Sequence, residues 1–338
     1  PSCQVAPSPL PISRSPAVRS KGMARGIPTP SFLRLLPPTN HAANGAEQDP
    51  SGDKTEHARD AFLSSLPGAF FILWYTFFMH QSDPQSSLAL ITGASSGIGR
   101  ELARLFARDR HHLFLVARDE NGLLSLKSEL EEQSGVIVTC CVGDLTDEDF
   151  LLSLPARVRE TGVPLIYLVN NAGSGTKGDF GSTDWRKEQK SIRLNALVPT
   201  LLTKLFLSDL MANQGKVLFV CSTASFLPGP GMAVYYATKA YLLSLAESLR
   251  CELSSCGVSV TALLPGPTAT GFQEANGLPP LSSGRYPSAA VVAALGYRAL
   301  AQGQALALCG WKNRLTYFFA KFAPRSLTRA LLAWRSHR

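Results

Sequence analysis

The chain has 338 residues, 45% of them hydrophobic, so it is long enough to bury one large α/β core. Its formal net charge is +8, and residues 1–45 and 275–338 contain no acidic side chain. This basic charge is not accompanied by a cationic stripe with interleaved aromatics, a helix-turn-helix pattern or zinc-finger spacing. The composition therefore argues against a nucleic-acid partner.

Seven cysteines are scattered along the chain without a CxxC pair, and none of the six histidines lies in a motif-bearing loop. Protein zinc sites use closely spaced Cys and His ligands, so the spacing predicts no metal site. Scattered thiols without a disulfide framework are typical of a reducing intracellular compartment, either the cytoplasm or an organelle.

Two N-terminal segments precede the periodic part of the chain. Residues 1–60 are rich in Pro, Ser, Ala and Arg and are predicted to be disordered, either as a transit peptide or as sequence upstream of an initiator at Met23. Residues 61–84 form a linker with the uncharged aromatic run Ala69–Met79. At 1.5 Å per residue this run is too short for a bilayer core of roughly 30 Å. It is interpreted either as an interfacial helix in peripheral membrane contact or as a helix packed on the domain or a partner.

Residues 85–310 alternate short β-branched or Leu-rich runs with amphipathic stretches, which is typical of βαβ units. We expect seven strands: Leu88–Thr92, Leu113–Ala117, Val136–Val142, Leu165–Asn170, Lys216–Cys221, Ser259–Leu264 and Ala305–Cys309. The predicted fold class is α/β, a single doubly wound parallel sheet with helices on both faces.

The first expected strand runs into a glycine-rich turn, TGASSGIG (Thr92–Gly99), which opens a periodic helix. Glycine allows torsions and a close phosphate approach that a Cβ would block, and the free N–H groups of the helix start attract a pyrophosphate. Glycine spacing alone is weak evidence, but the flanking strand and helix indicate a dinucleotide site. Its expected contacts are Gly93, Ser95, Ser96, Gly97, Ile98 and Gly99.

The second expected strand ends at Ala117–Arg118, where the choice of nicotinamide cofactor is usually made. A carboxylate at this place binds the ribose hydroxyls of NAD but repels the 2′-phosphate of NADP. Here alanine removes the carboxylate, and the Arg118 guanidinium suits a phosphate, with Ser95 as a further donor. The alternative is that Asp119 pairs with Arg118 or caps the next helix. The sequence predicts NADP (NADPH) in preference to NAD.

Seven motifs follow one another in the order of a single protein family: TGASSGIG (Thr92–Gly99), GDL (Gly143–Leu145), NNAG (Asn170–Gly173), Asn195 in SIRLNA, STAS (Ser222–Ser225), YYATK (Tyr235–Lys239) and PGPTAT (Pro265–Thr270). Over residues 85–278 the chain thereby resembles the short-chain dehydrogenase/reductase family. The resemblance implies a Rossmann domain, a nicotinamide cofactor, a homodimer or homotetramer, and hydride exchange with a small-molecule carbonyl or alcohol.

The resemblance also assigns the site. It implies a catalytic set of Asn195, Ser222, Tyr235 and Lys239, with the cofactor also contacted by Asp144, Leu145, Asn171, Ala172, Gly173, Tyr235, Lys239, Pro265, Gly266 and Thr268. In the family a residue like Asn195 holds a water between the active-site lysine and solvent. The alternative for this amide, a poor helix former, is an ordinary polar helix position.

The residues support this chemistry independently. Tyr235 and Lys239 are four apart on an expected helix and share one face. A neighbouring ammonium, with an oxidised nicotinamide, favours phenolate and lowers the phenol pKa from near 10. Ser222, at a strand end, is expected to hydrogen-bond the substrate oxygen. Ser225 and Tyr236 are competing candidates, but Tyr236 lies about 100° further around the helix and is expected to point elsewhere.

Two later segments bear on substrate and partners. Residues 268–288 are rich in Gly and Pro and nearly uncharged, and in the family this region closes over the substrate. Its apolar residues favour an apolar carbonyl or alcohol as the substrate. The alternative is a generic mobile loop whose residues carry no information about the substrate. Residues 311–338 form a basic aromatic tail that Pro324 is expected to divide into two short helices. This tail is interpreted as a contact for an anionic membrane surface or partner, or as a segment docked on the domain.

Two rival interpretations share the dinucleotide site. One is a nucleotide-binding Rossmann sensor or scaffold without turnover, against which the retained Tyr235 and Lys239 argue. The other is an epimerase or dehydratase of the extended Rossmann group, against which the GxxxGxG spacing and the short segment after Lys239 argue. The favoured prediction is an NADP-dependent oxidoreductase.

Overall fold

The computed structural model describes residues 87–276, 279–281, 286–324 and 326. The expected leader (1–60), the aromatic run 69–79 and the second tail helix after Pro324 lie outside these residues. Within the described part, no helix is both long and apolar enough to cross a bilayer.

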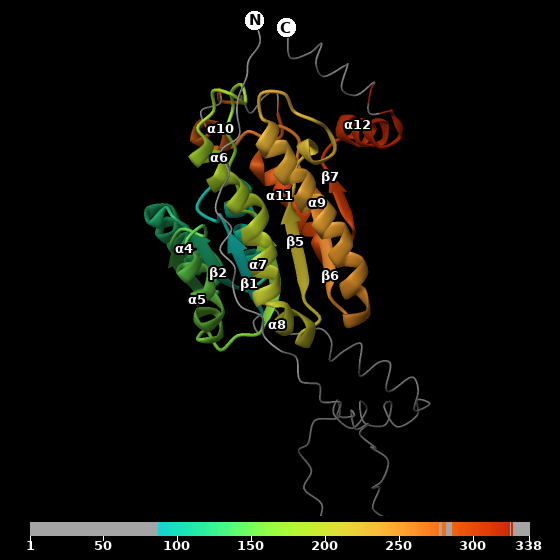
Figure 1. Ribbon diagram of the computed structural model, residues 1–338. Helices are drawn as coiled ribbons and strands as arrows, with labels where there is room; N and C mark the ends of the chain where they lie inside the picture. Colours follow the sequence, from blue (N-terminus) through green and yellow to red (C-terminus); the bar gives the residue numbers. More distant parts are fainter. Residues whose placement is uncertain (1–86, 277–278, 282–285, 325, 327–338) are drawn as a thin grey trace, which may run out of the picture. The chain divides into compact units, whose positions relative to one another are not determined.

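Seven parallel strands form one sheet in the order β3-β2-β1-β4-β5-β6-β7 (Figure 1). Their bounds are β1 (Leu88–Thr92), β2 (His112–Ala117), β3 (Val138–Val142), β4 (Leu165–Asn170), β5 (Lys216–Val220), β6 (Ser259–Leu264) and β7 (Leu306–Leu308). Each differs from its expected range by two residues at most, and the predicted fold class is confirmed. The strand order reverses between β1 and β4, which is where doubly wound sheets bind their ligands.

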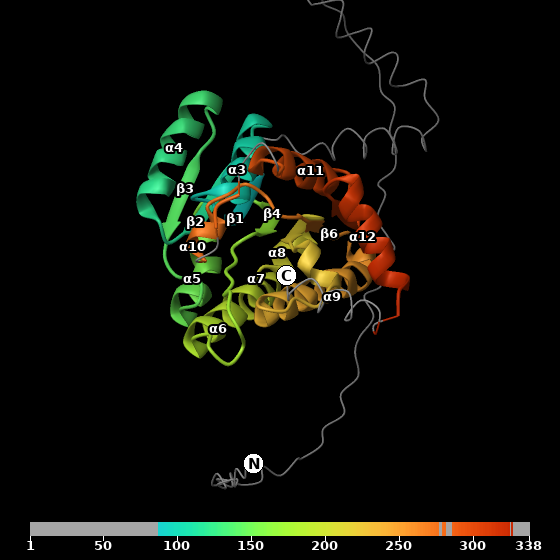
Figure 2. The ribbon, with the colours of Figure 1, turned by 90° about the horizontal axis from the view of Figure 1, so that it is seen from above.

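Helices cover both faces of the sheet (Figure 2). One layer contains α3 (Gly97–Arg108), α4 (Glu120–Ser134) and α11 (Ala289–Ala301), and the other contains α5 (Glu148–Arg159), α7 (Val198–Leu205), α8 (Leu207–Ala212) and α9 (Ala233–Leu253). The remaining elements are α6 (Trp185–Ile192), η2 (Arg193–Leu197), η3 (Thr223–Phe226), η4 (Ser254–Cys256), α10 (Phe272–Ala275) and α12 (Trp311–Phe322). The first half of the expected tail is therefore a helix that ends before Pro324.

The first strand shows why the sheet can be recognised from its sequence. Leu88 and Leu90 of β1 pack into one core layer, whereas Ala89 and Ile91 pack into the other. All five residues of β1 are buried. A parallel strand covered on both faces needs apolar side chains at every position, so it appears in the sequence as a continuous hydrophobic run.

Candidate active site

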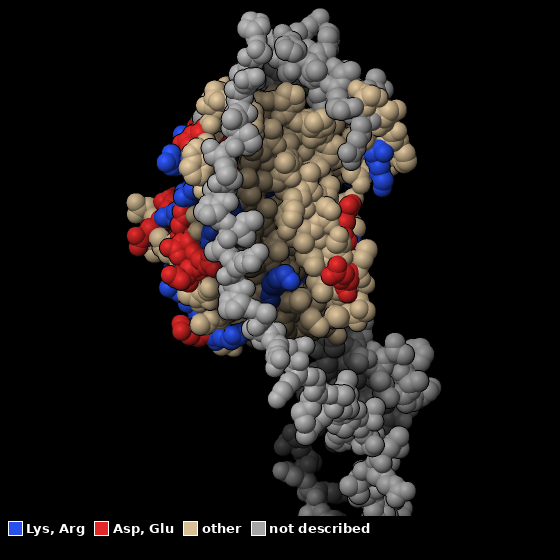
Figure 3. All heavy atoms as spheres, viewed as in Figure 1, with Lys and Arg blue, Asp and Glu red and all other residues tan. Residues whose placement is uncertain are grey.

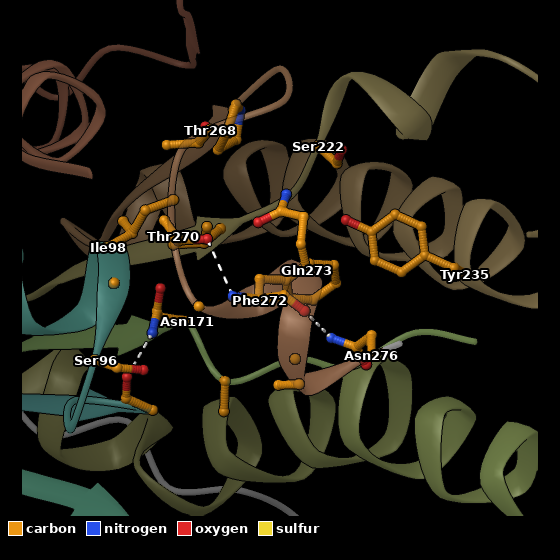
Figure 4. Close-up of a pocket in the computed structure, with 18 of the residues that line it drawn as sticks. Ser96, Ile98, Asn171, Ser222, Tyr235, Thr268, Thr270, Phe272, Gln273 and Asn276 are labelled. Carbon is orange, nitrogen blue, oxygen red and sulfur yellow. Dashed lines mark hydrogen bonds between the residues drawn. The ribbon is translucent and has the colours of Figure 1, made fainter. Parts of the chain in front are cut away.

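A cavity of about 900 Å³ opens at the carboxyl ends of the central strands. It is lined by every site residue expected from the sequence except Gly99 and Asn195. Figure 4 shows Ser222 and Tyr235 on one side of this cavity and Ser96, Ile98 and Asn171 on the other.

The glycine turn after β1 has no room for side chains. Gly93 and Gly97 have φ angles of 65° and 56°, in the left-handed region that favours glycine. A Cβ on Gly99 would lie 2.3 Å from the carbonyl oxygen of Gly93. Asn171 at the end of β4 donates from Nδ2 to the Thr92 and Gly93 carbonyls at 2.8 and 3.1 Å. The amide of Asn171 therefore holds the turn against the neighbouring strand.

The start of α3 is suited to an anion. Ser96 is the N-cap residue, but its side chain makes no capping hydrogen bond. The first N–H groups of a helix have no intrahelical acceptor, and the helix dipole favours negative charge beside them. The uncapped helix start and the glycine turn thus fit the pyrophosphate of a dinucleotide.

Arg118 lies at the cavity and pairs with no acidic group among the residues described by the structure. Asp119 instead caps α4, where its Oδ1 accepts a hydrogen bond from the Gly122 N–H at 3.1 Å. Of the alternatives open for Asp119, the structure shows the helix cap. Ser95 lies close by, since its Cβ is 3.0 Å from the place of a Cβ on Gly122. Arg118, Ser95 and the start of α3 therefore border the same cavity.

Asp144 provides a fixed negative charge after β3. Its Oδ2 accepts from the Lys190 ammonium at 2.7 Å, and its Oδ1 accepts from the N–H and hydroxyl of Thr146 at 3.0 and 2.8 Å. Burial raises the pKa of Asp144, but these hydrogen bonds outweigh it and lower the pKa to about 2. Lys190 on α6 also lines the cavity, a residue that the sequence analysis did not single out.

Ser222 and Ser225 have different surroundings. Ser222 caps η3, and its Oγ accepts a hydrogen bond from the Ala224 N–H at 3.1 Å. The Oγ of Ser225 accepts from the Ser222 N–H at 3.3 Å, and Ser225 does not line the cavity. Ser222 accepts from the backbone, while its hydroxyl also hydrogen-bonds the Tyr235 phenol, so these two hydroxyls can contact one substrate oxygen together.

Tyr235 and Lys239 lie one turn apart on α9. The Lys239 Nζ is buried, donates to the Val220 carbonyl at 2.8 Å and lies 5.9 Å from the centre of the Tyr235 ring. Tyr236 lines the same cavity, so the expectation that it points elsewhere is wrong. Its ring fills the space that a Cβ on Gly229 would need.

The phenol of Tyr235 is harder to ionise than the sequence suggested. Burial raises the pKa of Tyr235 to about 12, although a hydrogen bond with Ser222 opposes the shift. Burial also lowers the pKa of Lys239. In the protein alone, burial therefore sets the direction of the shift, whereas the expected lowering of the phenol pKa also included the charge of an oxidised nicotinamide. The cost of placing an ionised phenol in an apolar surrounding exceeds the favourable interactions.

Asn195 lies in a π-helical turn, η2, rather than in a regular helix. Its side chain is 1% exposed and fully engaged: Oδ1 accepts from the Ser174 N–H at 2.9 Å, while Nδ2 donates to the Ser174 carbonyl at 2.7 Å and to the Thr238 hydroxyl at 3.0 Å. A Cβ on Gly173 would lie 3.2 Å from this Oδ1 and 3.5 Å from the Lys239 Nζ. Asn195 thus joins the loop after β4 to α9 close to the lysine.

The short helix α10 lines the cavity with Phe272, which belongs to the apolar segment expected over the substrate, and is followed by Asn276; Gln273 and Asn276 were not expected from the sequence (Figure 4). Asn276 accepts from the Gly175 N–H at 2.7 Å and donates to the Phe272 carbonyl at 2.6 Å. The ring of Phe272 lies 5.7 Å from that of Tyr235. Gln273 lines the cavity, and its Oε1 is buried without a partner in the described structure. A helix of four residues in a Gly/Pro-rich segment has no periodicity to reveal it.

Comparison with known proteins agrees with this geometry. Residues 87–278 match the family model described as short chain dehydrogenase. The very-long-chain 3-oxoacyl-CoA reductase of Kluyveromyces lactis is 29% identical over 202 residues, which is 57% of this chain and 58% of that protein. The match thus spans little more than half the length of this relative.

Two solved structures cover more of their own chains. A short-chain dehydrogenase from Sphingobium yanoikuyae in complex with NADPH is 31% identical, with a TM-score of 0.64 over 71% of this chain and 94% of that one. The bulky-bulky ketone specific alcohol dehydrogenase from Comamonas testosteroni is 31% identical, with a TM-score of 0.60 over 69% of this chain and 91% of that one. By the family match, the sheet order and the motif-bearing cavity, the chain belongs to the short-chain dehydrogenase family.

Proposed function

We propose that the protein is an oxidoreductase that transfers hydride between NADP(H) and an apolar carbonyl or alcohol. The observation that carries the proposal is that one cavity brings together a glycine turn, the cation of Arg118 and the side chains of Ser222, Tyr235 and Lys239. A sensor or scaffold that only binds a nucleotide does not require a phenol, a hydroxyl and an ammonium in the lining of one cavity. The NADPH-bound relative from Sphingobium yanoikuyae supports the same class of cofactor.

The residues present fit a dinucleotide. A Cβ at Gly93 or Gly99 would meet backbone atoms, so glycine lets the turn pack tightly, and the uncapped start of α3 leaves N–H groups for a pyrophosphate. Gly93, Gly97 and the start of α3 would bind the phosphates, Asp144 the adenosine end, and Lys239 the nicotinamide ribose. A bound nicotinamide supplies or accepts the hydride at the far end of this cavity.

Tyr235, Ser222 and Lys239 would handle the proton and the charge of the substrate oxygen. With a pKa of about 12 the Tyr235 phenol is protonated at neutral pH and can give its proton to a carbonyl that is being reduced. The Ser222 hydroxyl donates a hydrogen bond to the same oxygen and stabilises its developing negative charge. The Lys239 ammonium orients the ribose and favours the phenolate left after proton transfer. Asn195, whose side chain bonds Ser174 and Thr238, would position the loop after β4 beside Lys239.

The preference for NADP rests on charge. Arg118 has no acidic partner among the described residues, and Ala117 presents no carboxylate that would repel a 2′-phosphate. Because Asp119 is engaged in the cap of α4, the Arg118 guanidinium is free to form charge-assisted hydrogen bonds with phosphate.

The preference for an apolar substrate rests on the distribution of charges around the cavity. Apart from Lys239, the charged side chains that line the described cavity are Arg118, Asp119, Asp144 and Lys190, all of them towards the nucleotide end. The lining also includes the apolar residues Met232, Phe272, Pro279, Pro280 and Leu281, of which Phe272 has its ring centre 5.7 Å from that of Tyr235. A phosphate or carboxylate on the substrate would lose its hydration there without finding a free cation among the described residues. An uncharged ketone, aldehyde or alcohol fits better.

A homodimer or homotetramer is part of the proposal. The face of the domain over α7 and α9 shows few charged atoms in Figure 3. Apolar side chains of this region are exposed, among them Leu197 at 41% and Tyr241 at 45%. A broad face of two helices with few charges suits contact with a second copy of the chain. Light scattering on the purified protein would detect the dimer or tetramer.

The test of the function is a screen of NADPH consumption against uncharged aldehydes and ketones, including fatty and steroidal ones, with matched carboxylated analogues. We expect turnover of uncharged carbonyls with NADPH and at least about tenfold lower kcat/KM for the charged analogues. No NADPH or NADH consumption with any carbonyl, combined with tight binding of either cofactor, would favour the sensor.

A further inference from the structure

Helix α12, which follows β7, presents an uncovered apolar stripe. Trp311, Leu315, Phe318 and Phe322 are 71%, 62%, 57% and 77% exposed. Their spacing of four, seven and eleven residues places them along one side of the helix, and Phe319, 47% exposed, widens the stripe. Soluble proteins rarely leave so many large aromatic side chains exposed on one short helix without a binding role.

Cations border this stripe on both sides. At 3.6 residues per turn, Lys312 lies next to Phe319 on one side, and Arg314 and Lys321 lie next to Phe318 on the other. All three cations are exposed, and none forms an ion pair with the residues that the structure describes. No acidic residue occurs anywhere in 275–338. In Figure 3 the α12 end shows uncharged and basic atoms, whereas most acidic atoms gather over α4 and α5.

The opposite side of α12 holds the helix beside the cavity. The ring of Tyr317 packs edge-on against Phe226 of η3, with 5.2 Å between ring centres. The Asn313 amide donates to the Cys309 carbonyl at 2.6 Å and lies 2.6 Å from the place of a Cβ on Gly266, which lines the cavity. The helix is therefore docked through the side that carries Asn313 and Tyr317, and its apolar stripe is left facing outwards.

We propose that α12 is an interfacial helix that docks the protein on an anionic lipid surface. An aromatic stripe bordered by Lys and Arg matches the boundary between acyl chains and anionic headgroups, where apolar side chains enter the membrane and cations remain at its surface. A protein groove for the same helix would need acidic rims on both sides of an apolar floor. Docking through α12 also brings the cavity next to the lipid surface, from which an apolar substrate can enter.

The test is co-sedimentation of the full chain with vesicles of phosphatidylcholine containing about one third phosphatidylserine, and with pure phosphatidylcholine. We expect binding to the anionic vesicles and a loss of about tenfold or more in Leu315→Glu, because the stripe loses a buried apolar side chain and gains a repelled charge. Phe322→Glu is a second variant with the same expectation. Neither measurement depends on enzymatic activity.

The matched control is Ile137→Glu. Ile137 is as exposed as Leu315, 62%, but precedes β3, at the sheet edge opposite to β7. This variant should bind the anionic vesicles as the unmodified chain does. The proposal is overturned if the unmodified chain does not sediment with anionic vesicles, or if Leu315→Glu and Ile137→Glu behave alike. Release of a dimer by Leu315→Glu without any vesicle binding would assign the stripe to a second copy of the chain.

A charge variant tests the lipid headgroup. Lys312→Glu combined with Lys321→Glu should weaken binding to anionic vesicles by about fivefold or more per cation replaced, and added salt should reduce binding of the unmodified chain. Equal binding of the unmodified chain to neutral and anionic vesicles would contradict the anionic part of the proposal.

Discussion

The two halves of the domain are stabilised by different kinds of interaction. Every ion pair between described residues lies before residue 210, in the half that carries the glycine turn, Arg118 and Asp144. In the second half, buried or partly buried cations bond to backbone carbonyls instead. Arg250 donates to the carbonyls of Val260 and Gly303, and Lys239 donates to that of Val220. The half that contains the ion pairs carries the charged groups suited to a charged cofactor, and the half whose described residues form no ion pair carries the apolar lining suited to an apolar substrate.

The largest expected effect separates the chemistry of the second half from cofactor binding in the first. Tyr235→Phe should lower kcat by about 10³-fold or more, because it removes only the transferable proton and its oxygen. NADPH affinity, measured by fluorescence titration, should stay within about twofold. Tyr236→Phe is the matched control, since Tyr236 lines the same cavity, and it should keep most of the activity. Equal losses of kcat in both variants would contradict the assignment of Tyr235 as the proton donor.

The next largest effect tests whether the positive charge of Arg118, in the first half, sets the preference for NADPH over NADH. Ala117→Asp combined with Arg118→Ala restores a ribose-binding carboxylate and removes the phosphate partner. The ratio of kcat/KM for NADPH to that for NADH should fall by about ten- to a hundred-fold, the value of one charge-assisted contact. Arg186→Ala, which removes an arginine outside the cavity lining, should leave the ratio unchanged. An unmodified enzyme that uses NADH as well as NADPH would contradict the role of Arg118.

The pH dependence tests the raised pKa of Tyr235. A phenol whose pKa is about 12 is neutral below that pH, so carbonyl reduction, which needs the proton, should be nearly flat between about pH 6 and 8. Alcohol oxidation needs the phenolate, whose fraction rises about tenfold per pH unit below the pKa. Oxidation should therefore accelerate as the pH rises. A rate of oxidation that falls with pH would show that a different group accepts the proton.

The smallest effect concerns the hydrogen bond between the end of α10 and the loop after β4. Asn276→Ala removes the hydrogen bond that holds the end of α10 to Gly175 and the one that Asn276 donates to the Phe272 carbonyl at the start of the same helix. About 1 kcal/mol per lost bond predicts a KM for substrate raised about fivefold or more, with little change in kcat or in NADPH affinity. Asn276→Asp keeps the acceptor for the Gly175 N–H and should recover part of the loss. A fall in Tm with unchanged KM would instead show a purely structural role.

Much of the nucleotide half could be predicted from the sequence because its features are local. The run of β1, the turn Gly93–Gly99 and the following helix are adjacent in the chain, and each needs a particular residue type. Glycine is required where φ is positive or where a Cβ would meet the neighbouring carbonyl. The spacing of Tyr235 and Lys239 is local as well, because both belong to α9.

Tertiary structure alone decided the features that depend on distant residues. Local sequence could not show that burial outweighs charge in setting the pKa of Tyr235, or that Asn195 bonds Ser174 and Thr238 across two elements. The same holds for the contact of Asn276 in α10 with the loop after β4. Desolvation and hydrogen bonding between distant segments depend on which groups packing brings together, and no periodicity along the chain encodes that. The sequence by itself determined the fold class, the dinucleotide turn and the candidate residues, whereas packing decided how those residues are oriented and what closes over them.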